Sequence, residues 1–369
     1  MIALLLSLAP AQAGLLQISG FVSPQFTGVV RPDAVPEDRL IMGLQNSVAG
    51  VTFQGEPDER WAFKTYLLFA AADTFPAVTG VSAVDTDNDG SVDRIATSTS
   101  EAIGSLVREV SITFSPVEVF GIRLGRMPIP FTSQAQSPDT ALLFPQRAGP
   151  NQVFLADDDL GGLLELDVNG VFLASTGLFN GTGVGAGRSN DRGVLVVGRM
   201  DYNPLGDFAF NETAGMDAPF RVGVGGGVAW NPYTSYDSAG YEDVNVSDFR
   251  GSASARLAVA GLSVSGELLR RYQIDDLTHR PVEATGAYGQ AGWLLEFGLE
   301  PIFRMGWVEE DQSFEPRTTR WTDAGMNVYP GFDGDNPDAV RFTLQYLSEN
   351  RVTEQEVARG VSVRAQVKW

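Results

Sequence analysis

The sequence contains no cysteine, only one histidine and only two lysines, Lys64 and Lys368. Without cysteine, the chain has no disulfide framework, no zinc–thiolate site and no thiol nucleophile. A single histidine leaves little scope for histidine-based catalysis or for a metal site built from several imidazoles. These absences disfavour an enzyme, and we expect no catalytic residues.

Basic residues are scarce as well, because 46 acidic residues stand against 26 basic ones and the formal net charge is −20. A nucleic-acid partner requires a basic surface, so this class of partner is excluded. The length of 369 residues would suit two or three ordinary domains, but all-β barrels often use this much chain as one domain.

Long hydrophobic runs are confined to the N-terminus. Residues 2–9 are apolar apart from Ser7 and precede Ala11-Gln12-Ala13, which is typical of a secretory signal with cleavage after Ala13. The usual basic start of such a signal is missing, and a buried first helix is the alternative. Residues 14–369 contain no run near the ~20 apolar residues of a membrane-spanning helix. We therefore predict a signal peptide at 1–13 and a single domain at 14–369.

Strict alternation of apolar and polar residues dominates the rest of the chain, as in 105–114, 119–125, 249–258 and 360–369. Alternation with a period of two is typical of β-strands with two different faces, whereas an amphipathic helix needs apolar spacings of three and four. Sixteen strands are predicted, at 16–28, 47–55, 61–70, 105–114, 118–126, 160–167, 170–179, 193–202, 220–230, 248–259, 261–271, 284–296, 298–309, 321–329, 340–348 and 360–369.

The connections between these strands alternate between short and long. An even strand number, with short turns at one end and long loops at the other, is the geometry of a bacterial outer-membrane barrel. Two connections at the short-turn end, 203–219 and 330–339, are longer than this pattern expects. The predicted fold class is all-β: a 16-stranded antiparallel transmembrane β-barrel whose third long loop folds inward.

Aromatic residues fall near the predicted strand ends, where a lipid-embedded barrel has two aromatic girdles. A soluble β-sandwich with core tryptophans is the alternative, but it gives no reason for this placement. The expected girdle residues are Trp61, Tyr202, Trp293, Tyr329 and Trp369 at the short-turn end and Trp230, Trp307 and Trp321 at the long-loop end.

Several motifs resemble the phosphate-selective porin O and P family. The segment 118–131 reads Glu-Val-Phe-Gly-Ile-Arg-Leu-Gly-Arg-Met-Pro-Ile-Pro-Phe and is similar to that family's junction between a strand and its third loop. Residues 159–162, 177–181, 266–267, 287–288 and 299–301 resemble later parts of the family pattern. The resemblance implies a trimeric 16-stranded channel, narrowed by its third loop, that takes up phosphate or other small anions. Because the family's anion-selective members use rows of Arg and Lys, the scarcity of lysine disfavours phosphate selectivity here.

Alternation also assigns charged side chains to the two barrel faces. If apolar positions face lipid, their neighbours face the lumen, where charged rows bias the permeant ion. The alternative is that these charges pair across strands and keep the lumen wet and rigid. The predicted lumen bases are Lys64, Arg123, Arg199, Arg250, Arg256, Arg271, Arg304, Arg341, Arg364 and Lys368, and the predicted lumen acids are Glu109, Glu165, Asp201, Glu267, Glu300 and Asp323.

The third long loop, 127–159, carries an unusual apolar stretch at Ala141-Leu142-Leu143-Phe144. Folding against the inner wall would bury this stretch and make Arg147 the candidate pore-narrowing cation. Asp157, Asp158 and Asp159 would then oppose Arg147. A surface loop that packs against a neighbouring subunit is the alternative.

The second long loop contains Asp85-Thr86-Asp87-Asn88-Asp89-Gly90-Ser91-Val92-Asp93. Oxygen ligands at alternate positions with glycine at the sixth match the spacing of an EF-hand calcium loop, although the bidentate Glu at position 12 is replaced by Ala96. Asp85, Asp87, Asp89, Ser91 and Asp93 are therefore the candidate ligands of a weak Ca²⁺ site. A solvated acidic loop is the alternative.

These features together predict a porin of the bacterial outer membrane. Its partners would be outer-membrane lipid, small hydrophilic solutes or anions, and two further copies of the chain in a homotrimer. The predicted activity is passive diffusion with a mild anion bias, without a required cofactor. The alternative function is a calcium-binding structural or adhesive surface barrel with a blocked lumen.

Overall fold

A computed structural model describes residues 16–32, 40–44, 47–70, 78–84, 94–99, 107–154, 158–181, 188–189, 193–208, 210–236, 243–276, 281–312, 315–330, 339–353 and 355–369. The predicted signal peptide, the candidate calcium ligands and Asp157 lie outside these residues. Among the described residues, no helix is long and apolar enough to cross a membrane.

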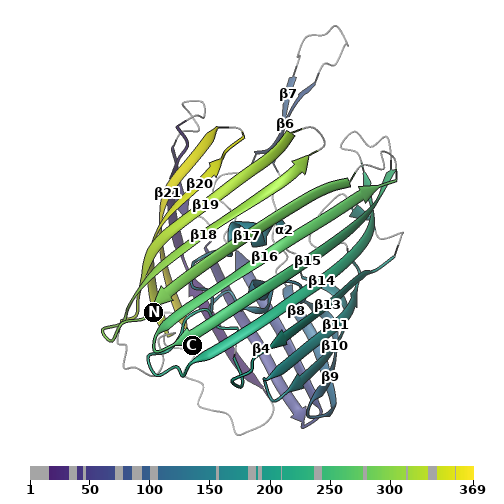
Figure 1. The fold of residues 1–369 in the computed structure, drawn as a ribbon, viewed down its shortest axis with the longest axis vertical. Coiled ribbons are helices and arrows are strands. Elements are labelled where there is room, and N and C mark those ends of the chain that lie inside the picture. Colours follow the sequence, from purple (N-terminus) through teal and green to yellow (C-terminus); the bar gives the residue numbers. More distant parts are fainter. Residues whose placement is uncertain are drawn as a thin grey trace.

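The chain forms a closed antiparallel barrel of 16 strands (Figure 1). β1 and β2 form one strand interrupted at Pro24, and β3 and β4 form its neighbour, because β1 pairs with β4 and β2 pairs with β3. β21 closes the barrel by pairing with both β1 and β2. The strands of the wall are β1 (Gln17–Ser23), β2 (Gln25–Val30), β3 (Leu40–Leu44), β4 (Val48–Asp58), β5 (Trp61–Ala70), β8 (Val107–Val117), β9 (Phe120–Met127), β10 (Asp159–Val168), β11 (Phe172–Phe179), β13 (Leu195–Tyr202), β14 (Arg221–Tyr236), β15 (Asp243–Val259), β16 (Leu262–Asp275), β17 (Pro281–Trp293), β18 (Leu299–Gln312), β19 (Glu315–Val328), β20 (Val340–Arg351) and β21 (Glu356–Lys368).

All sixteen predicted strands correspond to strands of the wall, so the predicted fold class is confirmed. The main differences lie at the long-loop end. There β14 extends to Tyr236 and β15 begins at Asp243, beyond the predicted limits, because the two strands stay paired as far as Tyr236 and Asp243. A hairpin of β6 (Val78–Val84) and β7 (Arg94–Thr99) belongs to the second long loop and projects above the rim (Figure 1). The two-residue strand β12 (Arg188–Ser189) pairs with β14.

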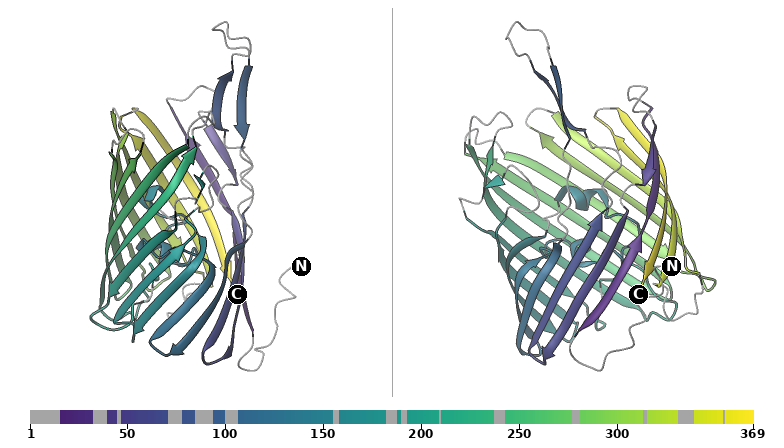
Figure 2. Two further views of the ribbon diagram at one scale, coloured as in Figure 1. Left: turned by 90° about the vertical axis from the view of Figure 1, so that its right-hand side faces the viewer. Right: turned by 180° about the vertical axis from the view of Figure 1, so that it is seen from behind.

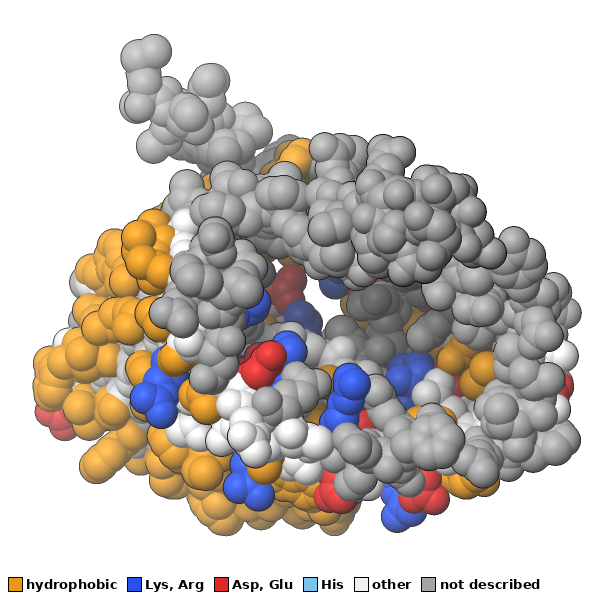
Figure 3. Space-filling view, turned by 90° about the horizontal axis from the view of Figure 1, so that it is seen from above, with side chains coloured by type: hydrophobic (Ala, Val, Ile, Leu, Met, Phe, Trp, Pro, Cys, Tyr) orange, Lys and Arg blue, Asp and Glu red, His pale blue; other side chains and the backbone are white. Residues whose placement is uncertain are grey.

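The outer surface of the barrel carries many apolar side chains, which Figure 3 shows along its left and lower edges. Ile112, Leu124 and Leu268 are 53, 59 and 63% exposed, although such side chains are normally buried in a water-soluble protein. They alternate with inward polar side chains, which is the pattern of a barrel solvated by lipid outside and water inside.

Six of the eight expected girdle residues are exposed, namely Trp61, Tyr202, Trp230, Trp293, Trp307 and Trp369. The assignments of Trp321 and Tyr329 to the girdles were wrong. Tyr329 is buried and donates a hydrogen bond to Glu300, and Trp321 packs against the segment that fills the lumen. Both residues lie near strand ends, as the sequence predicted. However, the alternation of side chains along β19, and at Tyr329 directly after it, directs both side chains towards the inside of the barrel.

The apolar core lies inside the barrel, where residues 127–154 and 158–159 fold against the inner wall (Figure 2). This third long loop contains two short helices, α1 (Ser133–Gln136) and α2 (Gly149–Phe154). Its buried side chains pack on the inner wall in two clusters, which include Met127, Ile129, Phe131, Leu143, Phe144 and Phe154. The inward fold therefore explains the apolar stretch that would be unsuitable on an exposed loop.

Candidate permeation path

The third loop is held inside the barrel by arginines of the wall. Arg199 Nη1 donates to the Phe131 carbonyl at 3.1 Å, Arg250 Nη1 to Phe154 at 3.1 Å, and Arg304 Nη1 to Gln146 at 2.7 Å. Each guanidinium carries several donors in a fixed plane, so it can bind a loop carbonyl and a second acceptor together.

Two further arginines bind the loop from β20 and β21. Arg341 Nη1 donates to the Leu142 carbonyl at 2.8 Å, and Arg364 Nη1 donates to the Pro145 carbonyl at 2.6 Å. Arg341 is 2% exposed and also donates to Gln366 Oε1. These basic side chains satisfy loop carbonyls that would otherwise be buried without partners.

Carboxylates on the same wall neutralise several of the arginines. Arg199 pairs with Asp201 at 2.7 Å, and Arg304 pairs with Asp323 at 2.6 Å. Asp248 accepts from both Arg250 and Arg271, at 2.7 Å each. On β13, β15, β16 and β18, the arginines that anchor the loop or lie beside it are therefore paired with carboxylates.

Open space lies on the opposite side of the third loop. A cavity of about 300 Å³ is bounded by loop residues 135–140 and Arg147 on one side and by β1, β4, β5, β8 and the end of β21 on the other. On the wall, Lys64 pairs with Glu109 at 2.6 Å, and Arg108 pairs with Asp158 at 2.6 Å. The Lys64 side chain is 45% exposed, so it meets the solvent of the cavity.

A second cavity, of about 320 Å³, continues the open side along β9, β10 and β11. Its wall carries Arg123, which pairs with Glu165 at 2.9 Å. Gln136 of the third loop borders both cavities. Seen from the long-loop end, charged side chains line a hollow within the barrel (Figure 3).

Arg147 is positioned by the third loop itself. Its Nη1 pairs with Asp139 at 2.5 Å, its Nε donates to the Gln134 carbonyl and its Nη2 donates to the Ser137 carbonyl. Burial disfavours the Asp139 carboxylate, but the charge and hydrogen bond of Arg147 outweigh burial and hold the pKa of Asp139 below its usual value. Arg147 thus faces the first cavity as half of an ion pair.

The predicted lumen bases Lys64, Arg123, Arg199, Arg250, Arg256, Arg271, Arg304, Arg341 and Arg364 contact inward-facing partners or line the cavities. Lys64, Arg123, Lys368 and the loop residue Arg147 border open space. The arginines of β15 to β21 are packed against inward-facing acceptors. Arg199 of β13 does both, because it binds the Phe131 carbonyl and also lines the second cavity.

Sequence reasoning missed several charged residues of this region, among them Asp139, the partner of Arg147. Alternation put Arg108 with the apolar face, but a register shift between β5 and β8 near Tyr66 turns it to the first cavity. Asp248 lies at the first position of a predicted strand, where parity was not assigned. Glu212 belongs to the long connection 203–219, whose excess length was the available signal.

The family-like motifs meet at the two ends of the third loop. Phe131, at the end of the 118–131 motif, has a carbonyl that accepts from Arg199 and from Ser252. Asp159 accepts hydrogen bonds from the backbone amides of Leu160 and Gly181. These residues fix where the loop leaves and rejoins the wall.

The described residues contain no group of three or more side chains suited to hold a metal ion. Asp85, Asp87, Asp89, Ser91 and Asp93 lie outside them, so calcium binding stays a prediction.

No family model and no curated relative matches the chain. Solved structures with the same fold include an anion-selective porin from Comamonas acidovorans, at 12% identity and a TM-score of 0.60 over 96% of this chain and 99% of that one. The outer membrane channel DcaP of Acinetobacter baumannii is similar at 11% identity and a TM-score of 0.61, over 97% and 99% of the two chains. OmpT of Vibrio cholerae is similar at 10% identity and a TM-score of 0.60, over 98% of this chain and 99% of that one. The fold is therefore that of bacterial outer-membrane porins, in agreement with the predicted outer-membrane location.

Proposed function

We propose that the chain is an outer-membrane porin that passes small hydrophilic solutes by passive diffusion. The observation that carries this proposal is the pair of cavities between the third loop and the wall from β5 to β11, both lined by charged side chains. A water-filled route beside an inward loop fits electrodiffusion, for which charged groups supply the local field and no chemistry is needed.

The anion bias that we propose is weak. Along the open side, Lys64, Arg108, Arg123 and Arg147 each pair with one carboxylate, at 2.5 to 2.9 Å. Ion pairs at such distances largely cancel beyond a Debye length, so the number of bases overstates the field that a passing ion meets. Phosphate selectivity, which the family resemblance implies, receives no support from this one-to-one pairing.

Three further predictions belong to the proposal. Residues 1–13 would be removed as a signal peptide, the barrel would assemble as a homotrimer, and the loop at 85–93 would bind Ca²⁺. A trimer form is stated for OmpT of Vibrio cholerae, which has the same fold. The exposed apolar surface would meet lipid or neighbouring copies of the chain.

The proposal is tested by recording single channels in a planar bilayer across a KCl gradient. We expect discrete open channels and a small reversal potential of the sign that indicates anion preference. A lack of conductance from correctly folded protein would contradict the porin and favour the alternative, a calcium-binding surface barrel with a blocked lumen. A clear cation preference would retain the porin and remove the anion bias.

A further inference from the structure

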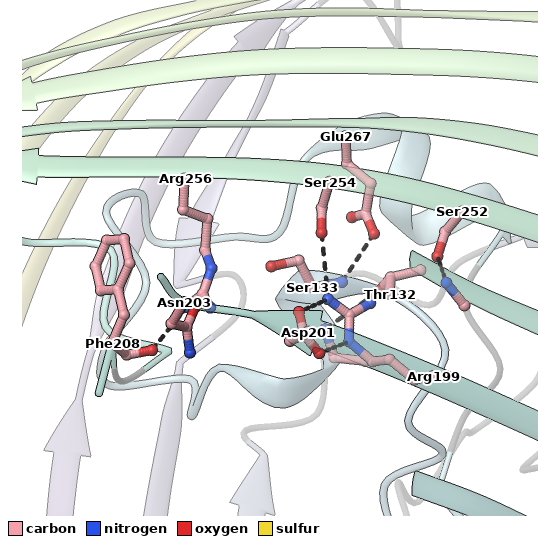
Figure 4. A network of polar contacts seen from close by, with 12 residues as sticks. Thr132, Ser133, Arg199, Asp201, Asn203, Phe208, Ser252, Ser254, Arg256 and Glu267 are labelled. Carbon is pink, nitrogen blue, oxygen red and sulfur yellow. Dashed lines mark hydrogen bonds and ion pairs between the residues drawn. The ribbon is translucent and has the colours of Figure 1, made fainter. Parts of the chain in front are cut away.

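The connection 203–219, which we call the inner turn, also folds into the barrel, from the end opposite the long loops. Arg256 of β15 lies over the rings of Phe208 and Phe210, at 4.7 and 4.2 Å from their centres, and its Nη1 donates to the Phe208 carbonyl (Figure 4). Gly261 and Ala260 donate backbone hydrogen bonds to Gly215 and Ala218. The inner turn is therefore fixed to the inner wall between β13 and β16.

Glu212 links the inner turn to the third loop. Its Oε1 accepts from Gln134 Nε2 at 2.8 Å, its Oε2 accepts from the Leu143 amide at 2.7 Å, and its own amide donates to the Ala141 carbonyl at 3.1 Å. Hydrogen bonds to a carboxylate are stronger than neutral ones, so both oxygens contribute to this clasp. It holds the loop at residues that flank the tip facing the first cavity.

Phe210 places the inner turn on the permeation path itself. It lines the second cavity together with Gln136 and with Arg123 and Glu165, the ion pair of β9 and β10. Arg199 and Arg256 both lie near this ring, which keeps it in a fixed position.

We propose that the inner turn is a second constriction of the channel, in which Phe210 narrows the path and Glu212 positions the third loop. This inference rests on the proposed porin function. The proposal predicts that residues outside the third loop control both the size and the steadiness of the current. The reason is that the inner turn supports the third loop in addition to the barrel wall.

The first test compares single-channel conductance of the parent with Phe210→Ala and Glu212→Ala. Removing the ring should raise conductance by about 1.5-fold, and removing the carboxylate should add brief fluctuations between current levels. The matched control is Phe297→Ala, which removes the same side chain from a turn at the same end where Phe297 is 69% exposed. Equal conductance and equal noise in all four proteins would overturn the proposal.

A cross-link tests the clasp within one molecule. In Ala141→Cys/Glu212→Cys the two thiols are the only ones in the chain and replace residues joined by a backbone hydrogen bond. We expect a disulfide to form under oxidation and to shift gel mobility, with steady parent-like current when oxidised and a noisy current when reduced. A failure of the two thiols to link, or an identical current in both states, would contradict the role of Glu212. If the parent protein gives no current, the porin proposal fails, whereas the gel shift still reports whether the two segments touch.

Discussion

Several arginine side chains of the barrel wall bind backbone carbonyls inside the barrel. Arg341 and Arg364 donate to the carbonyls of Leu142 and Pro145, and both are almost fully buried. A guanidinium is favoured over an ammonium at such sites because its planar donors reach two acceptors and it is less strongly hydrated. This preference gives a structural reason for a chain rich in arginine and nearly free of lysine.

Arg341→Met should destabilise the barrel by about 2 kcal/mol, because a buried carbonyl loses the donor that a charged group supplied. Unfolding in urea from lipid vesicles measures this change. The control is Arg270→Met, because Arg270 pairs with Glu283 on the surface with its side chain 67% exposed, and such pairs contribute about 0–1 kcal/mol. An equal loss in both variants would show that burial of the guanidinium is irrelevant.

The Asp139–Arg147 ion pair should make the third loop sensitive to acid. Arg147, with smaller contributions from Arg108 and Arg364, outweighs burial and lowers the pKa of Asp139 below 3.8. A depressed pKa in the folded state stabilises the fold above the unfolded value, and this stabilisation is lost as the pH falls through the folded value.

We therefore expect steady conductance from pH 7 down to about 4.5 and a change in current below about pH 3.8. The variant Asp139→Asn lacks the titrating group and should show the altered current at every pH in this range. Current traces recorded at matched salt measure both. A parent that changes near pH 6 would place the responsible group elsewhere.

Strands were the elements most readily predicted from the sequence, because a period of two is imposed by the difference between lipid and water on the two faces. The segment 203–219 was not assigned an inward fold, since nothing in its local pattern distinguishes a folded-back turn from an exposed one. Parity likewise gave the correct face for Glu109, but it was wrong for Arg108 because one register shift between β5 and β8 changes the face. Contacts between distant segments, such as Glu212 with Leu143, have no signature in a single sequence.

Helix α2 depends on close contact with β19. A methyl group added at Gly149 would overlap the ring of Trp321, so Gly149→Ala should displace α2 and destabilise the fold by about 1–3 kcal/mol. Gly289→Ala is the control, because a methyl group there meets no atom within 4 Å. Urea unfolding and near-ultraviolet circular dichroism of the tryptophans measure the effect. Two variants of equal stability would exclude a tight contact at Gly149.

At the scale of the whole molecule, the net charge of −20 says little about the permeation path. The open side carries bases and acids in matched pairs, and the other side carries arginines that are bound by the loop and by carboxylates. Selectivity should therefore follow the balance of the pairs that border the cavities, rather than the total charge.

Breaking one pair tests this balance. Glu109→Gln leaves the charge of Lys64 uncompensated and should shift the reversal potential towards anions, whereas Lys64→Gln should shift it towards cations. The double variant Lys64→Gln/Glu109→Gln should return close to the parent value. Recordings across a KCl gradient at low salt give the largest shifts, because screening is then weakest. A double variant that matches either single one would show that the pair is not the unit that sets the field.

The ladder is completed by residues at opposite ends of the chain, where Gly20 and Trp369 exchange two backbone hydrogen bonds of 3.1 Å. Bringing such distant residues together costs loop-closure entropy before their contacts stabilise the barrel. We therefore expect the pairing of β1 with β21 to form more slowly than the pairing of strands that are neighbours in the sequence. Before β21 pairs with it, the edge of β1 has unpaired backbone amides and carbonyls that can pair with strands of other chains. Pairing of β21 with β1 and β2 therefore removes the last free strand edges of the wall, and it joins segments more than 300 residues apart along the chain.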